Sequence, residues 1–162
     1  MVSRIGFSLL ALMVAGGCVG TDATAPSTRA VRPSPDAVLS ESPVRSGTLH
    51  FTKECSEYLF VAGSFCTVNS SELDQIEVGS RIIYGSPAGA TELNADVVLD
   101  TPGPGNNKAF GHCRLVFATS LGLCTFSGGT GKFTHFHASV VVSSLGAPQW
   151  SLDGTYSFSP HD

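Results

Sequence analysis

The sequence predicts an all-β domain of about eight short strands, preceded by an export signal and a tether. Apolar and polar residues alternate with period two in most segments after residue 45, and few segments there have helical periodicity. Turn-forming residues interrupt these segments roughly every 8–12 residues, a spacing typical of β-sandwiches and β-barrels. Of these two architectures we favour a small closed barrel, because closure leaves no exposed strand edges.

The first 17 residues have the features of an export signal. Arg4 supplies a positive charge, residues 5–14 are almost wholly apolar, and three small residues follow. The apolar run is about ten residues long, whereas a membrane-spanning helix needs about twenty. Cys18 directly follows two glycines, which resembles the lipobox of bacterial lipoproteins. We therefore expect residues 1–17 to be a signal peptide that is removed and Cys18 to be lipidated, which would anchor the protein to a membrane of the cell envelope. Because Val19 and not an aspartate follows Cys18, we expect the outer membrane or the cell surface, with the domain in the periplasm or outside the cell.

Residues 18–45 form the predicted tether. They are rich in proline, serine, threonine and alanine, and their charges alternate in sign. Such a segment buries too little apolar surface to offset the entropy cost of ordering it, so we expect a disordered linker. The barrel domain is then expected over residues 46–162, which is long enough for one modest core. The chain has a net charge of −4 and no run of basic residues, which excludes nucleic acid and anionic lipid surfaces as expected partners.

The strands expected within the domain follow one another along the chain. They lie at residues 47–51, 59–62, 72–78, 81–84, 94–100, 110–119, 123–127, 133–143 and 150–158. Residues 72–78 also fit a helical turn, and we favour a strand because a glycine and two β-branched residues follow soon. Residues 101–107 combine prolines, glycines and asparagines and predict a loop.

The last two segments show the clearest alternation. In the first of them, Phe136, Ala138, Val140 and Val142 share one face. His135 and His137 lie on the opposite face. In the second, one face carries Trp150, Leu152, Tyr156 and Phe158. Both patterns indicate strands with one face in the core and the other in water.

Four cysteines remain after Cys18, and an even number in an exported chain predicts disulfides. These are Cys55, Cys66, Cys113 and Cys124. They allow three pairings, and free buried thiols are the alternative. We favour the two local pairs, each eleven residues apart, because each would join neighbouring strands. Neither spacing matches a zinc motif.

The stretch Ser127-Gly128-Gly129-Thr130-Gly131-Lys132-Phe133 invites comparison with a phosphate-binding loop. That motif requires a first glycine where Phe126 stands and a serine or threonine after the lysine, where Phe133 stands. We therefore interpret the stretch as a tight glycine-rich turn between two strands.

The same turn, within residues 113–143, resembles a motif of the allene oxide cyclase and dirigent families, in which G-G-[TS]-G-x-F joins the late strands of an eight-stranded antiparallel barrel. Gly111 and the closing segment 150–158 fit the same layout. The resemblance implies an antiparallel barrel that binds small, largely apolar molecules. No polar pocket residue of those families matches a position here, so the resemblance assigns no catalytic residue. The cysteines, the tether and the export signal depart from the plant pattern.

Candidate ligand-binding residues are His135, His137, Trp150 and Tyr156. The two histidines project from one face of a strand, where they could share a metal, line a polar cavity or be solvated, and we favour solvation. No metal or cofactor is therefore expected. Aromatic residues that line a barrel mouth could hold an apolar ligand, although most are expected in the core.

Three functions fit these observations. The first is a tethered barrel that binds a small apolar or amphipathic molecule, and we favour it because the aromatic-rich pattern lacks a reactive constellation. The second is a structural or protein-interaction domain of the envelope. The third is a cyclase or isomerase, which would need an ionisable group inside the barrel, with His112, His135 and His137 as candidates. The oligomeric state stays open.

Overall fold

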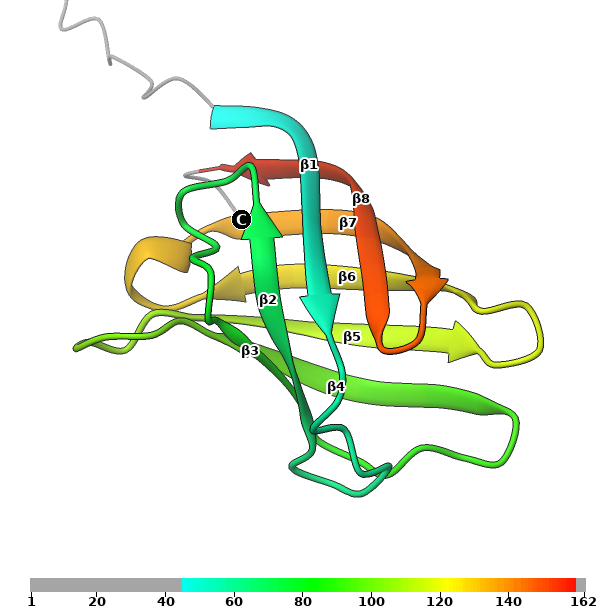
Figure 1. The fold of residues 1–162 in the computed structure, drawn as a ribbon. Helices are drawn as coiled ribbons and strands as arrows, with labels where there is room; N and C mark the ends of the chain where they lie inside the picture. Colours follow the sequence, from blue (N-terminus) through cyan, green and yellow to red (C-terminus); the bar gives the residue numbers. More distant parts are fainter. Residues whose placement is uncertain (1–44, 160–162) are drawn as a thin grey trace, which may run out of the picture. The chain divides into compact units, whose positions relative to one another are not determined.

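The computed structural model describes residues 45–159, which form a closed barrel of eight antiparallel strands (Figure 1). Each strand pairs with the next one along the chain, and β8 pairs with β1 to close the barrel. The strands are β1 (Arg45–Glu54), β2 (Phe65–Ser71), β3 (Arg81–Tyr84), β4 (Glu92–Asp100), β5 (Lys108–Val116), β6 (Leu121–Gly129), β7 (Phe136–Gly146) and β8 (Gln149–Phe158). The predicted all-β barrel is therefore confirmed.

Strand β4 illustrates how the sequence builds the wall. Leu93, Ala95, Val97 and Leu99 are buried, and the residues between them face outward. This alternation places every second side chain in the barrel interior. Strand β7 follows the same rule, since the predicted face with Phe136 and Val140 is buried.

One end of the barrel is filled by side chains from the connecting segments. Leu73 and Ile76 of the β2–β3 connection are buried there. Phe133, from the short 3₁₀ helix η1 (Gly131–Phe133), is also buried, and its ring centroid lies 5.3 Å from that of Phe136. These residues close the end at which β2, β4 and β6 finish.

Two expected strands are wrong. Residues 59–62 belong to a loop, in which the amides of Leu59 and Val61 donate to Ser64 Oγ instead of to a neighbouring strand. The strand that follows, β2, was missed because its residues are mostly polar. Residues 72–78 form turns, and the amide of Ile76 bonds to the carbonyl of Leu73. Their apolar side chains fill the barrel end and do not extend its wall.

The favoured cysteine pairing is confirmed, with disulfides Cys55–Cys66 and Cys113–Cys124. The second joins the neighbouring strands β5 and β6. Such bonds indicate a non-reducing environment. The glycine-rich stretch predicted as a tight turn is divided between two elements, since residues 127–129 end β6 and residues 131–133 form η1. Its glycines supply positive φ, with 92° at Gly128 and 58° at Gly131.

The predicted signal peptide, lipidated Cys18 and nearly all of the tether lie outside the described residues. Within residues 45–159, no helix has the length and apolar character needed to cross a bilayer.

Candidate functional site

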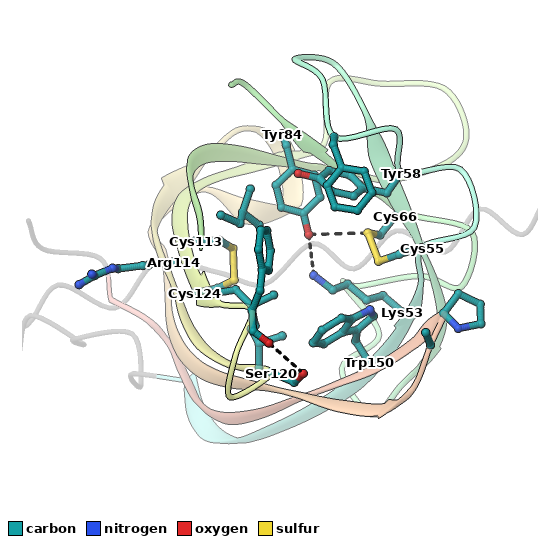
Figure 2. A pocket seen from close by; sticks show the side chains of 17 residues that line it. Lys53, Cys55, Tyr58, Cys66, Tyr84, Cys113, Arg114, Ser120, Cys124 and Trp150 are labelled. Carbon is teal, nitrogen blue, oxygen red and sulfur yellow. Dashed lines mark hydrogen bonds between the residues drawn. A yellow bond between two sulfur atoms is a disulfide. The ribbon is translucent and has the colours of Figure 1, made fainter. Parts of the chain in front are cut away.

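The end of the barrel opposite the filled one contains a cavity of about 490 Å³. Strands β1, β3, β5 and β7 finish at this end, and the other four begin here. Figure 2 shows most of the lining side chains gathered inside the ring of strands. The volume falls within the range of small-molecule pockets, about 300–1,000 Å³.

The cavity wall is largely apolar. Its aliphatic and aromatic side chains include Leu93, Leu115, Val142, Phe60, Phe117 and Trp150. Both disulfides also contribute to the wall. Such a wall favours the apolar part of a ligand, because binding removes apolar surface of both partners from water.

Lys53 extends into this cavity from the end of β1. It follows Leu49 and Phe51 on the interior face of the strand, and it is only 4% exposed. Its Nζ donates a hydrogen bond to Tyr84 Oη at 2.6 Å (Figure 2). Burial lowers the pKa of Lys53 to about 7, because removal from water disfavours the charged ammonium form.

Tyr84, at the end of β3, links the amine to a disulfide. Its Oη lies 3.7 Å from Cys66 Sγ. Because a disulfide sulfur carries no hydrogen, the Tyr84 hydroxyl is the donor in this contact. Burial raises the pKa of Tyr84, so the phenol stays protonated at neutral pH.

Tyr58 brings a second phenol to the cavity from the β1–β2 loop. Its ring packs edge-on against Tyr84, with the centroids 5.0 Å apart. The Tyr58 Oη is buried and has no hydrogen-bond partner among the described residues. Burial and, to a lesser extent, the nearby Tyr84 raise the pKa of Tyr58. An unpartnered buried hydroxyl is costly, and a ligand oxygen would satisfy it.

The residues that line the cavity include no carboxylate. The second cation among them, Arg114, points away from the cavity in Figure 2. Its guanidinium pairs with Glu92 at 2.9 Å on the outer surface. The charge state of the cavity therefore depends on Lys53.

Three consecutive apolar residues project at the mouth of the cavity. Leu59, Phe60 and Val61 are 70%, 59% and 54% exposed, and Phe60 also lines the cavity. The ring of Phe60 approaches Phe117 of the β5–β6 connection at 6.4 Å. This apolar lip gives a ligand a contact surface at the entrance.

The structure does not bring the four predicted ligand-binding residues together. Trp150 lines the cavity and pairs across the sheet with Lys53. Tyr156 lies six residues further along β8, which is about 20 Å at the rise of a strand. It lines a separate shallow depression together with His137. His135 is exposed in the turn before β7.

The histidines named for an enzyme do not enter the cavity. His112 lies on the outer surface of β5, where it bonds to Asp96 and Asn94. No group of three or more His, Cys, Asp or Glu in residues 45–159 is placed to hold a metal. The ionisable groups that line the cavity interior are Lys53, Tyr58 and Tyr84 instead.

Lys53 was missed by the sequence analysis, although a signal was present. Leu49, Phe51 and Lys53 occupy every second position of β1 and therefore lie on the same face of the strand. The period-two pattern that indicates a core position for Leu49 and Phe51 also indicates one for Lys53. Lysine is almost never fully buried unless it is paired, and a charged residue near a strand end is usually interpreted as exposed.

Comparisons of the chain with protein-family models, with curated proteins and with solved structures give no match, so the function of this cavity is inferred from its own geometry.

Proposed function

We propose that this protein is an exported, lipid-anchored barrel that binds a small amphipathic molecule in the cavity at its open end. The apolar part of the ligand occupies the aromatic wall, and its polar head contacts Lys53 Nζ and the hydroxyls of Tyr58 and Tyr84. The observation that carries the proposal is the combination of a cavity of about 490 Å³ with one buried amine among apolar side chains.

The arrangement of polar groups supports a ligand head that accepts hydrogen bonds. Lys53 supplies N–H donors, and the Tyr58 hydroxyl lacks a partner. A few polar groups in an otherwise apolar pocket fix the orientation of a ligand, while the apolar wall supplies most of the binding free energy. A carbonyl, carboxylate or hydroxyl head meets this requirement.

Export and anchoring are the second part of the proposal. They rest on the signal-like residues 1–17 and on Cys18, and the two disulfides agree with an oxidising compartment. Expression of the full chain in a bacterial host tests them. A mature protein that begins at a lipid-modified Cys18 is expected. A soluble protein that still carries residues 1–17 would contradict this part of the proposal. A Cys18→Ser variant that remains anchored to the membrane would contradict it as well.

The binding proposal is tested with Trp150, the only tryptophan of the chain. Because this residue lines the cavity, its fluorescence is expected to change as decanol or decanoate is titrated into the purified full chain. Saturation at micromolar ligand supports the proposal. A signal that stays unchanged or rises linearly without saturation counts against it.

A matched pair of variants assigns the fluorescence change to the cavity. Leu115→Phe adds volume to the cavity wall, whereas Val116→Phe places the same aromatic ring on the outer face of the same strand. We expect Leu115→Phe to weaken decanol binding about tenfold or more, the cost of roughly 1.4 kcal/mol of lost contact. Val116→Phe is expected to bind like the original protein. Equal affinities of both variants would place the binding site elsewhere.

A structural or protein-interaction role is the second candidate. It is favoured by apolar residues on the outer face of β6 and β7, where Leu121, Leu123 and Val141 are 52%, 48% and 51% exposed. Leu123 and Val141 are direct cross-strand neighbours. A protein that binds no amphipathic ligand but is crosslinked in cells through this face would favour the second role.

A further inference from the structure

The cavity holds a primary amine without a counter-ion. Tyr84 from β3 and Tyr58 from the β1–β2 loop are the titratable groups beside Lys53, and both are neutral phenols. Arg114 is turned outward and paired with Glu92. A buried ammonium without a carboxylate carries a large desolvation penalty. The neutral amine is favoured instead, and its nitrogen lone pair makes it a nucleophile.

The contacts of Tyr84 Oη position the amine. Lys53 Nζ lies 2.6 Å from Tyr84 Oη, and Tyr84 Oη lies 3.7 Å from Cys66 Sγ. When the Tyr84 hydroxyl donates to the sulfur, the amine donates one N–H to Tyr84 Oη, and its lone pair is free to attack a carbonyl carbon.

We propose that Lys53 captures the carbonyl group of an aldehyde or ketone ligand as a covalent imine. This inference rests on the proposed function, because the carbonyl compound first has to enter the cavity. Beyond the proposed function, it names carbonyl compounds as the class of ligand and a covalent bond from that ligand to Lys53.

The reaction balances without an oxidant or a reductant. The nitrogen lone pair attacks the carbonyl carbon, the C=O π electrons move to oxygen, and a proton passes from nitrogen to that oxygen. The resulting carbinolamine loses its hydroxyl group as water, with a proton supplied to the leaving oxygen. The nitrogen loses its second proton as the C=N bond forms. One amine and one carbonyl compound thus give one imine and one water.

Tyr84 and Tyr58 are placed to handle the protons of these steps. Their hydroxyls are protonated at neutral pH and can donate to the developing oxygen and to the leaving hydroxyl. The apolar wall also limits the water that would hydrolyse the imine. Tyr84 is a hydrogen-bond partner of the amine in the empty cavity, so it also positions Nζ.

The chain contains two internal controls. Its other lysines are Lys108 and Lys132. Lys108 pairs with Asp100 at 3.3 Å, and Lys132 pairs with Glu77, both at the protein surface. An ammonium group that is paired with a carboxylate has no lone pair with which to attack a carbonyl carbon.

The test incubates the oxidised full chain with decanal near pH 7.5, reduces any imine with cyanoborohydride, and maps the modified peptides by mass spectrometry. We expect Lys53 to gain the mass of decanal plus two hydrogens minus one water, with at least about tenfold greater occupancy than Lys108 or Lys132. Excess decanol, which fills the cavity but cannot form an imine, is expected to suppress modification of Lys53 only. Lys108→Met is expected to leave modification of Lys53 unchanged.

The outcomes separate the two proposals. Saturable binding of decanal and decanol with no preference for Lys53 in the peptide map overturns the imine and leaves the binding function standing. Failure of both molecules to bind overturns the binding function and the imine together. The Tyr84→Phe variant supplies a second test. Because the Tyr84 hydroxyl is also a proposed contact of the ligand head, the rates are compared at saturating decanal. We expect Tyr84→Phe to slow modification of Lys53 there, and an unchanged rate would remove Tyr84 from the proposed step.

Discussion

At the scale of single residues, Lys53 determines the chemistry of the cavity. The barrel wall places its amine among aromatic and aliphatic side chains, with one hydrogen bond to Tyr84 Oη and no carboxylate in the lining. A charge in this position would lower the free energy of unfolding. The protein avoids this by holding the amine in its neutral form over much of the neutral pH range.

This predicts that stability increases with pH above neutrality. The pKa of Lys53 is about 7 in the folded protein and near 10.5 in the unfolded chain. Below pH 7 both states bind the proton, and the penalty is fully present. Between these values the unfolded state binds more protons, so the free energy of unfolding rises. Relative to Lys53→Met, we expect a gain of about 2 kcal/mol from about pH 6.5 to about pH 8.5.

Urea denaturation of both proteins at several pH values measures this difference. The Lys53→Met variant is the control because it retains the histidines and carboxylates that also titrate. Parallel pH profiles of the two proteins would mean that the Lys53 amine has an ordinary protonation equilibrium.

Removal of the Tyr84 hydroxyl tests the hydrogen bond to the amine. In Tyr84→Phe, the buried Nζ loses its partner, and we expect the free energy of unfolding to fall by about 1–3 kcal/mol. Tyr156→Phe is the control, because this tyrosine is also partly buried but lies at the end of β8 that is distant from the cavity. We expect it to change stability by no more than about 0.5 kcal/mol. Similar losses in both variants would show that the Lys53–Tyr84 contact contributes little.

Part of the site could be predicted at this scale. Trp150, one of the predicted ligand-binding residues, lines the cavity, and the clear alternation of β8 had placed it on the interior face. The histidines were predicted from their chemistry, but His112 and His137 lie on strand positions outside the cavity and His135 lies in the turn before β7. Tyr58 and Phe60 could not be placed, because the loop that carries them has no periodic pattern.

At the scale of elements, the two disulfides have equal spacing but different surroundings. Each closes a loop with a sequence separation of 11 residues. Cys55–Cys66 closes the segment that carries Tyr58 and Phe60, and Cys66 contacts the Tyr84 hydroxyl. Cys113–Cys124 ties two paired strands together. Equal loops constrain the unfolded chain equally, so a difference between them reports on the folded cavity.

We therefore predict similar losses of stability and unequal losses of binding. Replacement of either cysteine pair by alanine is expected to cost about 3 kcal/mol of unfolding free energy in the chain-entropy model. The Cys55→Ala/Cys66→Ala variant is expected to bind decanol much more weakly than the Cys113→Ala/Cys124→Ala variant. Thermal unfolding and Trp150 fluorescence titrations measure the two effects. Equal affinities would show that order in the β1–β2 loop is not required for binding.

The elements also show where sequence patterns mislead. Residues 59–62 and 72–78 were predicted as strands, but one segment forms the exposed lip and apolar side chains of the other fill the closed end. In both segments the apolar side chains make contacts although the backbone does not form a strand. Strand β2 was hidden because it is short and polar along much of its length.

At the scale of the whole molecule, the barrel has two unlike ends. Leu73, Ile76 and Phe133 fill one end, and the cavity occupies the other. The closed fold was predictable because the interior face repeats every second residue in strand after strand. The location of the cavity was not, because it depends on which connections fold back into the barrel. The resemblance to the allene oxide cyclase and dirigent families stays a prediction.

The measurement that tests the central claim most directly is paired native and denaturing mass spectrometry of the oxidised full chain, purified from its own cellular compartment. We predict a native mass that exceeds the denatured mass by that of one small molecule, or a covalent addition that maps to Lys53 after reduction. The Leu115→Phe variant is expected to lose the noncovalent addition. Equal native and denatured masses, both without an addition and unchanged after incubation with decanol or decanal, would contradict the proposal that this barrel binds an amphipathic ligand.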